Sequence, residues 1–257
     1  MSDQTSTKIQ FDDIELLLCR SELYRLLASF YRHPLSEKLD YSSKEQKESL
    51  NDAITQLNSH NKNQLKASMK ALIHESGLIN LQEWISIYED CFSHTAHGTV
   101  SGYELEYGEE HTYRQPQQLG DIAAFYKAFG LQLNAKNHER VDHISIECEF
   151  MHFLSFKEAY ALEHGEKDNA GICRQASCRF LTEHLGRWAP SFALRLSKHT
   201  KTGLFKHLAD FTFEFIIEDC KTNGIISGPS DLPIRSVNEN YDSGCVTCSL
   251  KPGFQPL

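Results

Sequence analysis

Acidic, histidine and cysteine side chains stand at spacings that suit metal chemistry in two places in this sequence. Glu149 and His152 form a Glu-x-x-His pair, which would put a carboxylate and an imidazole on adjacent turns of a helix, as di-iron bundle proteins require. Those proteins need a second such pair and two further glutamates, and we find one pair. A metal-binding or redox enzyme using Glu149 and His152 is therefore the alternative hypothesis and not the favoured one.

The second place is the pair Cys245 and Cys248, which has the spacing of two metal ligands. A structural zinc site needs four ligands, so the pair would need distant partners. An unmetallated or transiently oxidised pair is favoured because a second Cys pair of this kind is missing. The chain also has no His-Glu-x-x-His motif, glycine-rich phosphate loop or Gly-x-Ser-x-Gly elbow. We predict no catalytic residue, no enzymatic activity and no cofactor.

The helix that must carry these acids spans about 142–164, with Asp142 as its predicted N-cap. At about 100° per residue, His143 and Glu147 share one stripe, and Asp142 and Glu149 share another. Apolar residues fill the remaining faces, so this helix should run through the middle of a bundle. Its acids must then pair internally, line a groove or bind a ligand. For His143 and Glu147, an intrahelical ion pair and contact with a peptide both remain open.

Composition favours a protein that binds a basic peptide. The chain has 257 residues, 40% of them hydrophobic, and a net charge of -9, which opposes binding to nucleic acid phosphates. No run approaches the roughly 18 apolar residues of a membrane span, and residues 1–10 lack the pattern of a secretory signal. We expect a cytoplasmic protein whose eight cysteines are reduced.

Helical periodicity dominates and hairpin-forming strands are not found, so we predict an all-α fold. The predicted architecture is one bundle of about eight to ten helices over residues 1–222, followed by an irregular, extended tail over 223–257 that could fold back over the body. Helices are expected at about 11–31, 42–59, 63–76, 81–92, 116–130, 142–164, 169–185, 191–200 and 204–222. Residues 93–113 lack periodicity and are either a surface linker or one wall of a recognition groove.

Two blocks carry a resemblance to a known family. The first is Asp142-His143-Ile144-x-x-Glu147-x-Glu149-Phe150-Met151, preceded by Glu139, and the second is Gln118-Leu119-Gly120-Asp121 continuing to Gly130. Together they resemble the TorD/DmsD/NarJ family of chaperones dedicated to molybdenum enzymes. When Lys157-Glu158-Ala159 is included, the sequence of these blocks is most similar to the subgroup serving dimethyl sulfide, ethylbenzene, selenate and chlorate oxidoreductases.

The resemblance implies a TorD-like fold and a cytoplasmic chaperone that catalyses no reaction. Such a chaperone would bind the twin-arginine leader and apo form of a molybdopterin catalytic subunit until its cofactor is inserted, before Tat export. Molybdenum cofactor delivery proteins are further implied partners, and the chain would be a monomer or a helix-exchanged dimer. A permanent structural subunit of the oxidoreductase is a third hypothesis. The predicted leader or client contacts are Tyr103, Glu104, Tyr107, Asp121, Phe125, Asp142, His143, Glu147, Glu149 and Phe150, with the Asp142-His143 end of the helix exposed for recognition.

Overall fold

The computed structural model describes residues 2–35, 44–57, 62–92, 100–108, 114–133 and 139–235, with side chains of the first helix described from Asp13 onward. Within these ranges the chain forms nine α-helices and one short 3-10 helix, and no strand, which confirms the all-α prediction. The elements are α1 (Ser2–Tyr31), α2 (Lys44–Gln56), α3 (Lys62–Ser76), α4 (Leu81–Phe92), η1 (Glu104–Glu106), α5 (Gln115–Ala128), α6 (Ile144–Glu163), α7 (Lys167–Glu183), α8 (Leu185–Thr200) and α9 (Leu204–Thr222).

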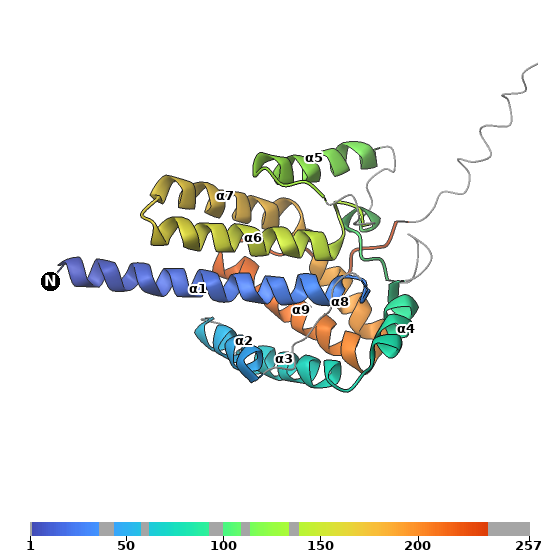
Figure 1. Ribbon diagram of the computed structural model, residues 1–257. Helices are drawn as coiled ribbons and strands as arrows, with labels where there is room; N and C mark the ends of the chain where they lie inside the picture. Colours follow the sequence, from blue (N-terminus) through green and yellow to red (C-terminus); the bar gives the residue numbers. More distant parts are fainter. Residues whose placement is uncertain are drawn as a thin grey trace, which may run out of the picture.

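The acidic helix α6 lies at the centre of the bundle, as its apolar pattern predicts. It packs along α1 on one side and α7 on the other (Figure 1). Helix α5 lies on the side away from α1, where its aromatic rings contact those of α6 and α7. On the far side of α1, α8 and α9 pack together and α3 covers α9. Ile144, Cys148, Met151 and Leu154 of α6 are completely buried. A helix with apolar residues on most of its surface is stable only when neighbours cover it.

Aromatic rings fill the space between α1, α4, α8 and α9. Tyr31, Phe92, Phe192 and Phe205 form a connected cluster with ring centroids 5.3 to 6.4 Å apart. Most of these contacts are edge-to-face, the arrangement that the ring quadrupoles favour. Complete burial of one such side chain contributes about 1.5–3 kcal/mol, so this cluster is a main source of the bundle's stability.

Helix α8 starts earlier than predicted, at Leu185 instead of Ser191, although Pro190 lies inside it. Proline has no N–H, so the carbonyl four residues earlier, at Gly186, loses its usual helical donor. The backbone N–H of Gly228 donates to this carbonyl at 2.9 Å. A contact from outside the helix therefore replaces the missing hydrogen bond and lets α8 continue through the proline.

Gly228 belongs to residues 225–235, here called the C-terminal strap, which lies against α8 and η1. The side chain of Ser191 donates to the carbonyl of Pro229 at 2.6 Å, and Arg195 donates to that of Leu232 at 3.0 Å. Gly108 N–H then donates to the Pro233 carbonyl at 2.9 Å. This part of the predicted tail folds back over the body, and residues 236–257 lie outside the described residues.

Candidate functional site

Three segments meet at the N-terminal end of α6: residues 100–108, residues 139–143 and the first turn of the helix. Glu104 N–H donates to the Asp142 carbonyl at 2.9 Å, and Ile144 N–H donates to the Gly102 carbonyl at 2.8 Å. Tyr103 and His143 thereby form an isolated antiparallel bridge. The described part of the aperiodic stretch is therefore not a surface linker. It is packed against the helix that carries the family-like motif.

Asp142 is completely buried, so the prediction that this end of the helix is exposed is wrong. Its carboxylate accepts two hydrogen bonds from Arg140, at 2.9 and 2.7 Å, and one from the Leu105 N–H at 3.1 Å. Arg140 also contacts Glu106 at 3.3 Å. Asp142 is not the N-cap, because its side chain is directed to the preceding loop and not to the helix. A buried carboxylate needs such partners to offset its desolvation.

His143 is the N-cap of α6 and is also buried, at 3% exposure, which again contradicts the predicted exposure. Its Nδ1 accepts from the Ser145 N–H at 3.3 Å, so the ring proton sits on Nε2. Burial lowers the pKa of His143, and the charges of Glu139 and Asp142 only partly oppose that shift. The neutral ring is held by contacts within its own chain, and the ion pair with Glu147 that remained open does not form.

Glu104 and Glu147 form a buried pair of acids beneath this corner. Glu104 accepts from Arg187 at 2.7 Å and contacts His184 at 3.0 Å. Burial alone would raise the pKa of Glu104, but His184 and Arg187 outweigh it and lower the pKa. Glu147 accepts from the Trp188 indole N–H at 3.0 Å. Burial and the negative charge of Glu104 raise the pKa of Glu147 well above its ordinary value, which favours the protonated form of this carboxyl.

Two aromatic residues of the predicted set also belong to the interior. The Tyr107 hydroxyl donates to the Ser101 carbonyl at 2.8 Å, and its ring packs on Trp188. Phe150 is 2% exposed and lies against Tyr126 and Phe180, with centroids 4.9 Å away in both pairs. Six predicted residues therefore form a buried frame and are not a surface: Glu104, Tyr107, Asp142, His143, Glu147 and Phe150.

The other four predicted residues reach solvent, but they do not form one cluster. Tyr103 is partly exposed, donates to Glu139 at 2.5 Å and has the Arg140 guanidinium 4.6 Å from its ring centroid. Glu149 is exposed and forms an ion pair with Arg32, the residue that follows α1. Asp121 is exposed on α5, and Phe125 is partly buried against Phe180.

An exposed aromatic stripe on α6 was missed by the sequence analysis. It consists of Phe153, Phe156 and Tyr160, and it continues from Glu149 at intervals of four, three and four residues, which place all four on one helix face. Phe156 is 48% exposed and Tyr160 is 44% exposed, while Phe153 packs on Phe129. The spacing was visible in the sequence. What it could not show is that the part of this face from Glu149 onward, and not its Asp142 end, is turned to solvent.

The alternative metal site is not supported by the placement of its ligands. Glu149 contacts Arg32, whereas His152 Nδ1 contacts the Ser21 hydroxyl at 2.8 Å. Within the described ranges, no three His, Cys, Asp or Glu side chains are placed to hold a metal. Cys245 and Cys248 lie outside those ranges. None of the described helices is long and apolar enough to cross a membrane.

Fold and site together define an all-α bundle whose motif acids are engaged in internal contacts and which presents an aromatic helix face to solvent. A family model described as nitrate reductase delta subunit matches residues 36–194, more than half of the chain. The chain belongs to this family, which confirms the resemblance to TorD and NarJ proteins.

Relatives of two kinds agree with this assignment. The perchlorate reductase assembly chaperone protein of Dechloromonas aromatica is 32% identical over 102 residues, 40% of this chain and 45% of the relative. The selenate reductase assembly chaperone protein of Thauera selenatis is 36% identical over 78 residues, 30% of this chain and 39% of the relative. Both alignments span less than half of the relative's length. Chaperone protein TorD of Vibrio cholerae is 24% identical over 78% of this chain and 90% of the relative. The perchlorate and selenate reductase chaperones support the predicted subgroup, and TorD supports the family.

Proposed function

We propose that this protein is a cytoplasmic chaperone for the catalytic subunit of a molybdopterin oxidoreductase and catalyses no reaction itself. The observation that carries the proposal is the family match over residues 36–194, together with relatives named as reductase assembly chaperones. The chaperone would bind the twin-arginine leader and apo form of its client and release the client after the cofactor is inserted.

The leader needs a surface that accepts positive charge next to an apolar stretch, and α6 offers one. Glu149 begins the exposed stripe, and the aromatic rings of Phe153, Phe156 and Tyr160 follow along the same face. Exposed apolar side chains in a row commonly mark a binding surface. An amphipathic leader helix could cover these rings while its basic end meets Glu149, in a chain of net charge -9.

The buried motif residues support this surface without touching the leader. Asp142 and His143 fix the start of α6 and the position of Tyr103. Tyr103 and Glu139 are joined by a hydrogen bond and are both partly exposed, so they connect the buried frame to the surface. The twin arginines would then be met by Glu139 and Glu149, both of which already have partners in the chain. A leader arginine can replace Arg32 at Glu149 at little cost, because this ion pair lies at a hydrated surface.

Co-expression with the catalytic subunit of a molybdopterin reductase from the same organism tests the function. We expect a complex with the apo subunit carrying its leader, no complex when both leader arginines are replaced by glutamine, and dissociation after the cofactor is inserted. A chain that stays bound to the mature enzyme would instead be a structural subunit. Equally strong binding of the subunit with the two leader arginines and of the subunit with glutamines in their place would contradict the proposal.

A further inference from the structure

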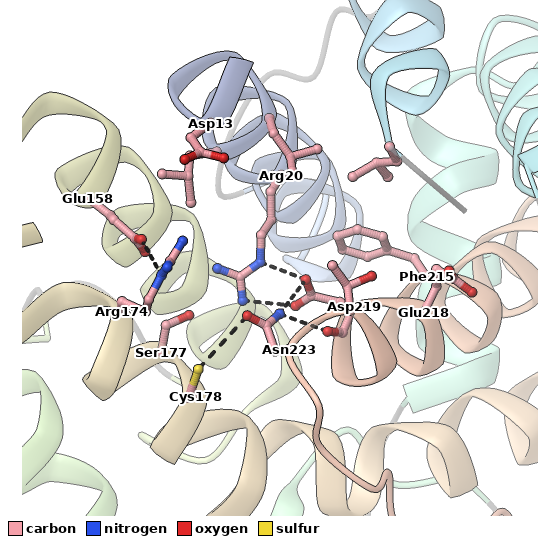
Figure 2. A pocket seen from close by; sticks show the side chains of 14 residues that line it. Asp13, Arg20, Glu158, Arg174, Ser177, Cys178, Phe215, Glu218, Asp219 and Asn223 are labelled. Atoms are coloured by element: carbon pink, nitrogen blue, oxygen red, sulfur yellow. Dashed lines mark hydrogen bonds and ion pairs between the residues drawn. The ribbon is translucent and has the colours of Figure 1, made fainter. Parts of the chain in front are cut away.

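A cavity of about 360 Å³ lies on another side of the bundle, between α1, α6, α7 and α9 (Figure 2). It is separate from the aromatic stripe, since Glu158, the α6 residue that lines it, is two residues from both Phe156 and Tyr160. Two residues correspond to about 200° around a helix, so the cavity and the stripe lie on opposite faces of α6. Its volume is within the range of pockets that hold small organic ligands.

The ion pair of Arg20 and Asp219 forms the floor of the cavity. Arg20 donates to both carboxylate oxygens of Asp219, at 2.7 and 2.9 Å, and the Tyr24 hydroxyl donates to the same carboxylate at 2.5 Å. Arg20 also donates to the Ser155 hydroxyl at 3.0 Å. The Asn223 side-chain amide donates to the same carboxylate at 3.3 Å. These four donors fix the carboxylate in place, and the pair of Arg20 and Asp219 adds no net charge to the cavity.

One wall carries a carboxylate that is only partly compensated. Glu158 is 3% exposed and accepts from Arg174 at 2.9 Å. The Arg174 side chain is 64% exposed, so water screens its charge. Burial raises the pKa of Glu158 above its ordinary value, Arg174 and Arg20 oppose the shift, and nearby Asp13 adds to it. The buried carboxylate would therefore be stabilised by another positive charge.

Two further lining acids have no partner among the described residues. Asp13 is exposed at the rim, whereas Glu218 is 8% exposed. With Glu158 and Asp219, the lining holds four carboxylates against the two guanidinium groups of Arg20 and Arg174. An excess of negative charge in a recess attracts a cation more strongly than the same charge on an open surface.

An unpartnered hydroxyl gives an independent sign of a ligand. Ser177 is 2% exposed, its Oγ has no hydrogen-bond partner among the residues that the structure describes, and it points into the cavity (Figure 2). A buried hydroxyl without a partner costs about 1–3 kcal/mol. Here a polar group held within the recess would supply the missing hydrogen bond. Leu17 and Phe215 give the same cavity an apolar lining.

We propose that this cavity binds a guanidinium or primary ammonium group on a short aliphatic stem. The cation meets the carboxylates of Glu158, Glu218 and Asp13, one of its N–H groups donates to Ser177 Oγ, and the stem packs on Leu17 and Phe215. Its source is either a free small organic cation or a basic side chain of another protein.

Calorimetry with the full chain tests this proposal, with L-argininamide as the probe and L-citrullinamide as the isostere that lacks the guanidinium charge. We expect saturable binding of L-argininamide with one site, and at least about tenfold weaker binding of L-citrullinamide, since charge recognition is lost. Equal affinity for the two probes, or no saturable binding of L-argininamide at millimolar concentration, would overturn the proposal.

Two isosteric variants locate the site. Glu218→Gln should weaken L-argininamide binding about tenfold, whereas Glu89→Gln, the same change on the exposed face of α4, should leave it unchanged. An unchanged urea midpoint of Glu218→Gln shows that folding is not the cause. Equal effects of the two variants would contradict the location. Blocked Ala-Arg-Ala separates the sources: it should bind as tightly as L-argininamide if a protein side chain is the ligand, and more weakly if the ligand is a free cation.

L-argininamide binding to the cavity and leader binding to α6 can be measured separately. The client leader should bind without displacing L-argininamide, because the two surfaces lie on opposite faces of α6. Failure of L-argininamide to bind would leave the chaperone proposal intact, and failure of the leader to bind would leave the cavity proposal intact.

Discussion

Arg140 donates two hydrogen bonds to the completely buried carboxylate of Asp142, from Nε at 2.9 Å and from Nη2 at 2.7 Å. This bidentate pair gives an internal role to an acid that the sequence pattern had assigned to leader binding. Arg140→Ala should lower the free energy of unfolding by about 2 kcal/mol, which is less than for a fully buried pair because Arg140 itself is partly exposed. Urea unfolding measures the change.

Arg179→Ala is the matched control for Arg140→Ala. Arg179 pairs with Glu183 at 2.9 Å on the exposed face of α7, where water screens the interaction. Its urea midpoint should equal that of the wild type. If both variants shifted the midpoint equally, the pair between Arg140 and Asp142 would not have the structural role assigned to it.

Glu147→Gln should become more stable relative to the wild type as pH rises. The raised pKa of Glu147 means that the folded protein binds this proton more tightly than the unfolded chain. Wild-type stability is therefore lost as pH rises from the unfolded carboxyl pKa of about 4.3 toward the raised folded pKa. Gln does not titrate and can still accept from Trp188. Unfolding of both proteins by urea between pH 5 and 8 measures the difference, and parallel pH profiles would show that Glu147 is already ionised.

The Arg20 and Asp219 pair joins α1 to α9 across the interior. Asp219→Ala should cost about 3–5 kcal/mol, because it leaves a buried guanidinium and the Tyr24 hydroxyl without their acceptor. The double variant Arg20→Met, Asp219→Leu should recover much of this loss, since no buried charge remains. Thermal and urea unfolding compare the two. A double variant as unstable as Asp219→Ala would show that packing, and not the unpaired charge, is the cause.

Gly228→Ala should destabilise the protein by about 1–3 kcal/mol. A Cβ at this position would lie 1.9 Å from the Arg187 carbonyl oxygen, so the strap must move away from α8 and the hydrogen bond to Gly186 weakens. Gly171→Ala is the control: it lies inside α7 with nothing near the added methyl group, and alanine favours a helix by about 0.5–1 kcal/mol. Equal behaviour of the two variants in urea unfolding would contradict the role of the strap.

The sequence predicted the helices and the central place of α6 because both follow from local periodicity. It could not predict which charged side chains are buried and paired within the chain. The partners of Glu104 lie more than 75 residues away, on His184 and Arg187, and no spacing rule connects them. The start of α8 was missed for a similar reason: Pro190 indicates a break, and only the distant Gly228 restores the hydrogen bond. The exposed Phe156 and Tyr160 were missed because an apolar stripe indicates burial unless its neighbours are known.

Titration of the client's leader peptide into the wild type and into the Phe156→Ala, Tyr160→Ala double variant tests the central claim most directly. Both side chains are more than two-fifths exposed, so the variant should fold normally. If α6 presents the binding surface, the affinity should fall at least about tenfold, as for removal of central aromatic contacts. Undiminished affinity in a folded variant would contradict the account and place the leader elsewhere.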